Sequence, residues 1–353
     1  MAYFITGGTG FIGRNFIDRL KEREGDIYVL TRAGSRAKFE DLQERMGDHA
    51  ERLVPVEGDL QQPLLGLDEA TIADLKGNVK HFCHFAAIYD LSASAEDQVK
   101  TNIEGTRNAI RLAEALDAGC FQHVSSIAAG GLYKGTFRED MFEEAEGLDH
   151  PYFATKHDSE GIVRNECQVP WRLYRPAMVV GNSKTGEIDK IDGAYYFFKS
   201  LQKIRQVLPP WFPLVGIEGG KFNIVPVDYV VDAMDHIAHQ DDLDGRCFHL
   251  TDPEHHSMGA MMNIFAEAGH APRFNMRLDT RMFGFIPGFV RETLAGLPPV
   301  KRIISNLLAD MGLPDSVTMF MNYPTRYDNR DTERALKGSG ISCPELRDYA
   351  PVI

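Results

Sequence analysis

The sequence predicts an α/β protein whose core is a doubly wound parallel sheet. From residue 1 to about 181, short apolar segments alternate with helical patterns, as in parallel strands joined by crossover helices. A glycine-rich turn follows the first apolar segment, and a bulky, aromatic, proline-interrupted region follows residue 181. We therefore expect one sheet domain and a smaller, discontinuous C-terminal lobe.

Six strands are expected in the first half, because β-branched and aromatic residues gather in short runs bounded by turns. They cover residues 3–6, 27–31, 53–57, 80–86, 121–126 and 172–174. Helices are expected from residue 11 to about 23 and from 98 to 118, where apolar residues recur at helical spacing.

The expected domain boundary lies at Gly181, after which the sequence becomes richer in bulky aromatic residues interrupted by proline. Residues 1–181 form the expected first domain, and 222–250 return to it through the apolar run 222–227 and a helix at 228–239. Segments 182–221 and 251–353 form the expected substrate lobe. Its apolar stripe at 301–311 is expected to roof a tunnel, pack the lobe or touch a lipid surface.

Composition limits the function classes. The 353 residues carry a net charge of -13, which argues against a nucleic-acid partner. Five widely spaced cysteines without a C-x-x-C pair indicate neither a disulfide framework nor a zinc site. The first strand leaves no room for a signal peptide, and no apolar run reaches the ~18 residues of a membrane span. We expect a cytoplasmic protein, with peripheral membrane contact left open.

The glycine-rich turn predicts a Rossmann-type dinucleotide site. Gly7 would allow a tight turn, Gly10 a close approach to a pyrophosphate, and Gly13 close packing of helix on strand. The helix that follows would direct its positive N-terminus at the phosphates. The expected contacts are Thr6, Gly7, Gly8, Thr9, Gly10, Phe11, Ile12 and Gly13.

The end of the second expected strand favours NADPH over NADH. A carboxylate that would bind the adenosine ribose is missing there, and Arg32 stands in its place, with Arg36 nearby. A guanidinium would pair with a 2′-phosphate, although a solvated loop arginine is the alternative. Further expected cofactor contacts are Asp59 and Leu60 at the adenine, and Ala86 and Ala87 after the fourth strand.

Tyr152 and Lys156 predict proton transfer. Residues four apart on a helix share a face, so the Lys156 ammonium would lie near the Tyr152 hydroxyl. An adjacent cation would lower the phenol pKa from about 10 toward neutrality. Lys156 would also hold the nicotinamide ribose.

These motifs together resemble the extended short-chain dehydrogenase/reductase family. The resemblance covers about the first 240 residues and is carried by the glycine turn, Asp59, Asn102, Ser125-Ser126, Tyr152 to Lys156 and Arg175-Pro176. It implies that Ser126 polarises the substrate carbonyl, with Ser125 as the runner-up. It also implies that Asn102 holds a structural water or a backbone carbonyl, and that Pro176 and Val179 shape the nicotinamide pocket.

A narrower resemblance covers the whole chain. The stretches 125–129, 137–145, 216–220 and 322–326 are similar to the N-terminal reductase unit of bacterial NADPH-dependent fatty acyl-CoA reductases. This implies reduction of a long-chain fatty aldehyde to the fatty alcohol, with the fatty acyl-CoA thioester as a further substrate. It also implies a second reductase unit C-terminal to this chain, and the wider family implies a homodimer.

Other interpretations remain open. The same fold serves sugar-nucleotide epimerases and dehydratases and steroid-type dehydrogenases, and a non-catalytic NADP-binding sensor is a third class. Lys190, Lys199, Lys203 and Arg205 would meet a coenzyme A phosphate or form a solvated face. The pairs His236/His239 and His255/His256 lack a convergent third ligand, so we expect no metal site.

Overall fold

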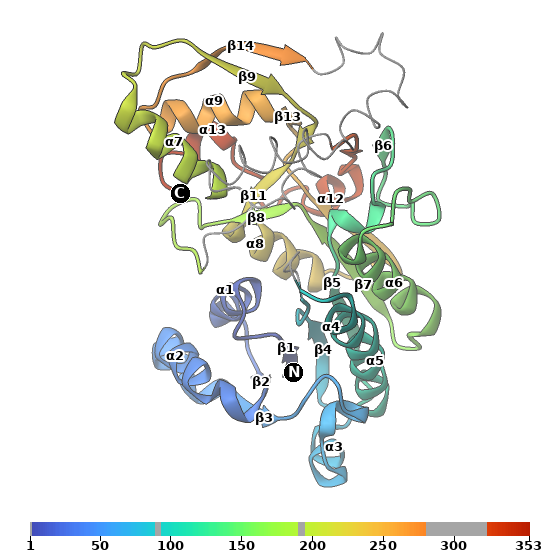
Figure 1. Ribbon diagram of the computed structural model, residues 1–353. Helices are drawn as coiled ribbons and strands as arrows, with labels where there is room; N and C mark the ends of the chain where they lie inside the picture. The colour runs from blue at the N-terminus through green and yellow to red at the C-terminus, as the bar shows by residue number, and fades with distance from the viewer. Residues whose placement is uncertain (1, 89–92, 190–194, 280–322) are drawn as a thin grey trace. The chain divides into compact units, whose positions relative to one another are not determined.

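The computed structural model describes residues 2–88, 93–189, 195–279 and 323–353 (Figure 1). The chain divides into two compact units. Unit 1 comprises Met1–Val179, Val225–Thr251 and Tyr327–Cys343, and unit 2 comprises Val180–Ile224, Asp252–Arg326 and Pro344–Ile353. Residues 327–343 group with unit 1, whereas the sequence-based boundaries put them in the substrate lobe.

Unit 1 is built on a seven-stranded parallel sheet in the order β12-β7-β5-β4-β1-β2-β3. This confirms the expected Rossmann-like α/β fold. The strands are β1 (Ala2–Thr6), β2 (Asp26–Thr31), β3 (Leu53–Glu57), β4 (Val79–His84), β5 (Cys120–Val124), β7 (Trp171–Pro176) and β12 (Arg246–Leu250).

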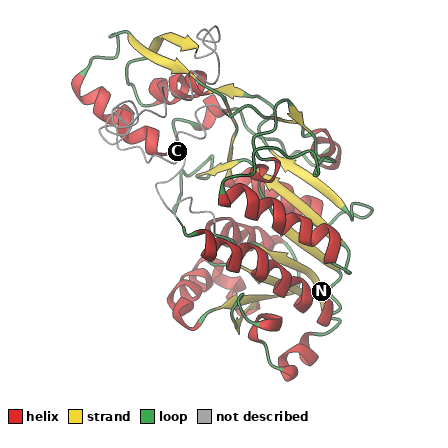
Figure 2. Ribbon diagram, turned by 45° about the vertical axis from the view of Figure 1, so that its right-hand side comes forward, coloured by secondary structure: helices red, strands yellow, loops and turns green. Residues whose placement is uncertain are grey.

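Helices cover both faces of this sheet (Figure 2). One core cluster joins the sheet to α1 (Phe11–Arg19), α2 (Arg36–Met46) and α8 (Val227–Ala238). The other joins it to α3 (Glu69–Leu75), α5 (Gly105–Ala115) and α6 (Pro151–Glu166). Because both faces are covered, β1 is a continuous buried run, with Tyr3 and Ile5 in one cluster and Phe4 in the other.

Two expected elements differ in the structure. The helix expected at 98–118 consists of α4 (Ala95–Gln98), a π-helical turn (Val99–Glu104) and α5. The run 222–227 does not join the main sheet. It forms β10 (Lys221–Phe222) and β11 (Ile224–Pro226), which pair in separate two-stranded sheets. The strand that returns to the main sheet is β12, a five-residue segment that the sequence patterns missed.

Unit 2 contains a second, smaller sheet. Strands β9 (Leu214–Glu218) and β14 (Phe274–Asp279) pair in parallel, and α9 (Met258–Ala268) packs against them. Helix α7 (Tyr195–Val207) also contacts α9, where the Phe198 and Phe265 rings meet edge to face at 4.6 Å. The stripe at 301–311 lies outside the described residues.

Short elements complete the description. They are β6 (Thr136–Phe137), β8 (Met178–Val180), β13 (His256–Ser257), β15 (Arg326–Tyr327), α12 (Arg330–Ala335) and α13 (Leu346–Tyr349). Within the described ranges, no helix has the length and apolar character needed to cross a bilayer.

Candidate active site

The glycine turn after β1 has the geometry of a phosphate cradle. Gly7 has a φ of +71°, and a Cβ there would lie 2.6 Å from the backbone nitrogen of Ala86. A Cβ at Gly13 would lie 2.2 Å from the carbonyl oxygen of Gly7, so the helix packs directly on the turn. The Gly10 N–H donates to the Gly7 carbonyl at 3.0 Å and closes the turn. Side chains at Gly7 and Gly13 would therefore destroy it.

The N-terminus of α1 is suited to an anion. Gly10 is its N-cap residue and no described side chain caps the helix there. Its first turn also carries no acidic residue. Backbone N–H groups at a helix start need acceptors, and the helix dipole favours negative charge at this end. The turn and helix thus fit the pyrophosphate of a dinucleotide.

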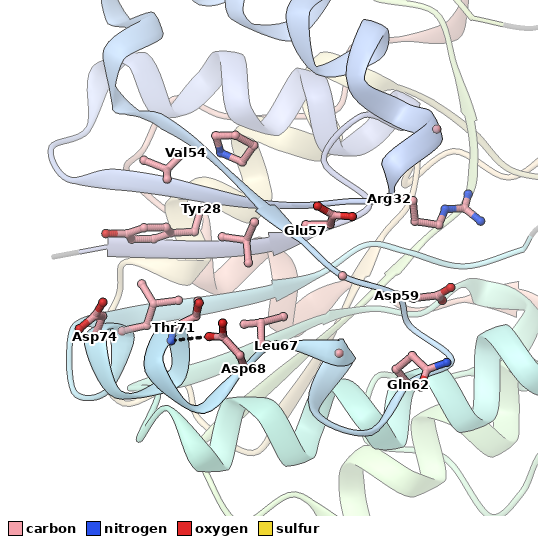
Figure 3. A pocket seen from close by; sticks show the side chains of 16 residues that line it. Tyr28, Arg32, Val54, Glu57, Asp59, Gln62, Leu67, Asp68, Thr71 and Asp74 are labelled. Carbon is pink, nitrogen blue, oxygen red and sulfur yellow. Dashed lines mark hydrogen bonds between the residues drawn. The ribbon is translucent and has the colours of Figure 1, made fainter.

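Arg32 and Asp59, two of the expected adenosine contacts, line one hollow of about 950 Å³. Figure 3 shows Arg32, Asp59 and Gln62 at one end of it, with Tyr28 and Asp74 at the other. Arg32 is exposed and follows β2 directly. This end of the hollow provides both a cation and polar groups after neighbouring parallel strands, where nucleotides bind in this fold.

Two further expected cofactor contacts, Arg36 and Leu60, lie outside this hollow. Arg36 begins α2 and pairs with Glu40 at 3.2 Å, with its side chain 88% exposed. Leu60 packs against a core cluster, and its carbonyl accepts a 2.9 Å hydrogen bond from the Asn108 amide. Neither residue lines the hollow as the described side chains stand.

Tyr152 and Ser126 come together at the end of β5. Tyr152 lies in the first turn of α6, and its hydroxyl is 3.5 Å from the Ser126 Oγ. The Ser126 Oγ also accepts a 3.1 Å hydrogen bond from the Ala128 N–H. Ser125, in contrast, donates to the Glu160 carboxylate at 3.0 Å. Only the Ser126 hydroxyl therefore faces Tyr152.

Burial controls the titration of Tyr152 and Lys156, which both lie on α6. Burial raises the pKa of Tyr152, and the Ser126 hydroxyl partly offsets that rise. Our expectation that the Lys156 ammonium lowers the pKa of Tyr152 is therefore wrong for this structure. Burial also lowers the pKa of Lys156 to about 8, although Glu160 opposes that change. A lysine brought near neutrality holds its proton less firmly and suits proton exchange.

Glu160 and Arg175 form a fully buried ion pair behind Ser125 that the sequence patterns missed. The Arg175 guanidinium donates to both Glu160 oxygens, at 2.9 and 2.5 Å, and Arg164 donates to Oε1 at 2.7 Å. Burial alone would raise the Glu160 pKa, but these guanidiniums lower it below its usual range. Glu160 follows Lys156 by four residues, and this helical spacing indicates that the two side chains share a face of α6.

Asn102 lies in the π-helical turn, and its side chain binds backbone groups. Its side-chain amide donates to the Ile88 carbonyl at 3.0 Å, and its oxygen accepts from the Ile88 N–H at 2.8 Å. The same amide is 3.3 Å from the Thr155 hydroxyl, next to Lys156. Asn102 therefore connects the loop after β4 to the helix that carries Tyr152.

A buried chain of hydrogen bonds runs from the glycine turn to Asn102. The Thr6 hydroxyl lies 2.7 Å from His84 Nδ1, and His84 Nε2 lies 3.2 Å from the Thr106 hydroxyl. Thr106 donates to the Asn102 carbonyl at 2.7 Å. Burial lowers the His84 pKa to about 3, so His84 is a neutral bridge. Thr6 also accepts from the Ala86 N–H at 3.4 Å.

The remaining expected residues lie at the ends of neighbouring strands. Ala86 and Ala87 follow β4 and are half-buried. Pro176 ends β7 and is buried, and Val179 packs partly buried against a core cluster. Among the described residues, no group of three or more histidine, cysteine or acidic side chains is arranged to hold a metal ion.

Comparison with known sequences gives three informative relatives. A family model described as Male sterility protein matches residues 5–234. The non-canonical nonribosomal peptide synthetase hkm10 of Aspergillus hancockii is 26% identical over 99% of this chain and 35% of its own length. The aldehyde reductase lnbA of Aspergillus flavus is 26% identical over 91% of this chain and 33% of its own. The fatty acyl-CoA reductase wat of Drosophila melanogaster is 26% identical over 65% and 52%. This chain thus spans about a third to a half of these relatives.

Solved structures agree with the fold. The terminal R domain from the myxalamid PKS-NRPS pathway has a TM-score of 0.76 at 25% identity, covering 99% of this chain and 88% of that domain. The reductase domain of a nonribosomal peptide synthetase from Mycobacterium tuberculosis has a TM-score of 0.69 at 20% identity, covering 99% and 89%. UDP-glucuronic acid 4-epimerase from Bacillus cereus, in complex with NAD, has a TM-score of 0.65 at 15% identity, covering 100% and 95%. The last two share the fold with this chain.

Proposed function

Because this chain belongs to the family described as Male sterility protein, within the extended short-chain dehydrogenases/reductases, we propose that it is an NADPH-dependent reductase of long-chain fatty aldehydes. The family and the glycine turn make it an oxidoreductase with a nicotinamide cofactor. The choice of NADPH, the aldehyde and the residue roles belong to the proposal.

The observation that carries the proposal is the approach of Tyr152 to Ser126 at 3.5 Å. Reduction of a carbonyl needs a hydride at carbon and a proton at oxygen, and a bound nicotinamide supplies the hydride. A carbonyl oxygen placed between the two hydroxyls would accept a hydrogen bond from each. Tyr152 would transfer its proton to that oxygen as the alcohol forms, and Ser126 would stabilise the developing negative charge.

Lys156 supports this step from the same helix. Its ammonium, weakened by burial, would hold the nicotinamide ribose and return a proton to the tyrosinate. Asn102 and His84 hold the backbone near Tyr152 and Lys156 in place. Each of these two side chains makes hydrogen bonds through both of its polar atoms. Held polar groups lower the reorganisation needed in the transition state.

NADPH is favoured by one cation, Arg32, which lines the adenosine hollow together with Glu57, Asp59, Asp68 and Asp74. Arg32 stands there without a carboxylate at the end of β2, and it would bind a 2′-phosphate by charge-assisted hydrogen bonds. Asp59 is on the neighbouring strand end and would meet the adenine instead.

The substrate class is supported by names of relatives and by composition. Two of the similar proteins are an aldehyde reductase and a fatty acyl-CoA reductase. Unit 2 includes the aromatic and proline-rich stretches 195–198 and 209–213, a composition that suits an apolar acyl chain, since each buried methylene adds about 0.8 kcal/mol to binding.

A second candidate function is reduction of a carrier-bound thioester to the aldehyde. The whole-chain likeness to the myxalamid terminal R domain favours it. In this case a further unit of the same protein would present the substrate. A thioester would take the first hydride at its carbonyl carbon and a proton at oxygen, and the resulting hemithioacetal would release the thiol to leave the aldehyde. A second hydride would then give the alcohol.

The deciding experiment is NADPH oxidation by the purified chain with decanal and with a fatty acyl-CoA. We expect turnover with decanal, lower turnover with NADH, and loss by at least ~100-fold in Tyr152→Phe. Tight NADPH binding without turnover on any lipid would reject the aldehyde proposal. Turnover with the acyl-CoA alone would favour the thioester reaction.

A further inference from the structure

The connection between α7 and β9 in unit 2 (Figure 1) carries exposed apolar side chains. Most large hydrophobic side chains of the described chain are buried, but Val207 and Trp211 are each 79% exposed and Phe212 is 40% exposed. Three prolines accompany them, in the segment Pro209-Pro210-Trp211-Phe212-Pro213. We call residues 207–213 the Trp211 loop. Large apolar groups gathered on a surface mark a contact site.

The tip of the Trp211 loop is a closed turn. The Phe212 N–H donates to the Pro209 carbonyl at 2.9 Å, which places Pro210 and Trp211 at the two central positions. Proline fixes the backbone at its position, so the apex has little freedom to lose on binding. The Trp211 and Phe212 ring centroids are 6.4 Å apart, so the two rings form one apolar tip.

The segment that carries this loop has a charge opposite in sign to that of the whole protein. Residues 195–214 include Lys199, Lys203 and Arg205 and no acidic residue, although the chain as a whole carries -13. Lys203 and Arg205 are exposed, and Arg205 donates to the Gly269 carbonyl at 2.9 Å. That bond holds the Arg205 guanidinium at the C-terminal end of α9.

We propose that the Trp211 loop binds the surface of an anionic lipid bilayer. Tryptophan prefers the membrane–water interface because its ring is apolar and its N–H is polar. Lysine and arginine behind an apolar tip add attraction to anionic headgroups. The two adjacent rings of this tip suffice for shallow insertion among headgroups. The proposal goes beyond the reductase reaction and depends on unit 2 alone.

The test is co-sedimentation of the full chain with vesicles, without substrate or turnover. We expect binding to vesicles of phosphatidylcholine mixed with phosphatidylglycerol, and at least roughly fivefold weaker binding to phosphatidylcholine alone. Added salt should reduce the difference, because exposed charges are screened. The double variant Trp211→Ser/Phe212→Ser should bind at least ~10-fold less to the mixed vesicles.

Matched variants separate the apolar contribution of the two rings from the electrostatic contribution of the cations. Lys203→Gln/Arg205→Gln should remove the preference for phosphatidylglycerol. Val352→Ser, at another exposed apolar residue of unit 2, should bind as the unchanged chain does. NADPH binding and the melting temperature of every variant report its folding. Equal vesicle binding by the Trp211/Phe212 variant and the unchanged chain, or no binding to either vesicle, would overturn the proposal.

Fluorescence gives an independent measurement. The chain has two tryptophans, and the other, Trp171, begins β7 in unit 1. In a Trp171→Phe background, Trp211 emission should shift to the blue with mixed vesicles and be quenched by brominated lipid. An unshifted and unquenched Trp211 on bound vesicles would show that another surface makes the contact, and would also overturn the proposal.

Discussion

Ser125 and Ser126 are adjacent in the chain, but their hydroxyl groups have different partners. Ser125 donates to the buried Glu160 carboxylate at 3.0 Å, whereas Ser126 Oγ lies 3.5 Å from the Tyr152 hydroxyl. Extended backbone turns successive side chains to opposite sides, and Ser126 has extended φ and ψ of -163° and 155°. One serine is thus placed for chemistry and the other for structure.

This relationship predicts different effects of two similar substitutions. Ser126→Ala should lower kcat with decanal by about 10²-fold, because one donor to the developing oxyanion is lost. Ser125→Ala should leave kcat within a few-fold and reduce the free energy of unfolding by about 1–2 kcal/mol, because a buried carboxylate loses a hydrogen bond. Steady-state kinetics and urea unfolding measure both quantities. If Ser125→Ala lost activity and Ser126→Ala lost only stability, the two proposed roles would be reversed.

Lys156 predicts opposite pH trends for activity and stability. Its folded pKa of about 8 is below the ordinary 10.5, so the unfolded chain binds more protons between these pH values and stability rises with pH there. Turnover should instead fall as pH rises through about 8, because the ammonium is lost. Lys156→Met should abolish turnover, raise stability at neutral pH by about 1–3 kcal/mol and remove the stability trend. Thermal unfolding and pH-rate profiles test this; wild-type activity that stays constant to pH 10 would contradict it.

Glu160 and Arg175 predict a large loss of stability when one partner is changed alone. Glu160→Gln should cost about 3–5 kcal/mol, because Arg175 would remain charged and fully buried. The double variant Glu160→Gln/Arg175→Met should cost less than the sum of the single changes. Glu166→Gln is the control on the same helix, since its 2.8 Å pair with Arg107 is solvent-exposed and should be worth less than ~1 kcal/mol. Additive single costs in urea unfolding would argue against a coupled pair.

Arg32 predicts a cofactor preference. Arg32→Ala should raise KM for NADPH about 10-fold and leave KM for NADH unchanged, because only the 2′-phosphate contact is lost. Arg36→Ala should have a smaller effect, since that side chain is 88% exposed and already pairs with Glu40. Kinetics with both cofactors at low and high salt would check this. A parallel rise in both KM values would indicate damage to the fold of the hollow.

Gly13 predicts a loss of cofactor binding from a single methyl group. A Cβ there would lie 2.2 Å from the Gly7 carbonyl, so Gly13→Ala must displace α1 or open the turn. NADPH affinity should fall by at least ~10-fold, with a clear drop in melting temperature. Gly105→Ala is the control, because a Cβ at Gly105 would meet its nearest atom, Leu60 Cβ, at 3.4 Å, an ordinary contact distance. Unchanged NADPH titration in Gly13→Ala would contradict the cradle geometry.

The fold could be predicted from the sequence because the patterns that indicate it are local. The glycine turn, the buried strand β1 and the helix after it follow from spacing and residue type, and six of the seven sheet strands were expected within a few residues. Strand β12 was missed because it is short and carries Arg246 and His249 among its apolar residues. Its pairing partner β7 lies far away in sequence, and pairing of that kind leaves no local pattern.

The candidate site was predictable only in part, for a similar reason. Tyr152 and Lys156 follow from helical spacing, whereas the choice between Ser125 and Ser126 depends on what each hydroxyl faces. The direction of the Tyr152 pKa depends on burial, which opposes the simple charge argument. Glu160 became visible as a partner only once β5, β7 and α6 were placed together.

The late position of β12 has a consequence for synthesis on the ribosome. Strand β7 pairs with β12 along its outer side, yet Arg246 is translated long after Pro176. Until then, a nascent chain presents β7 as an open edge with unpaired N–H and carbonyl groups, which invites aggregation. Synonymous codons that slow translation between these two strands should therefore lower the yield of soluble enzyme while leaving every amino acid unchanged.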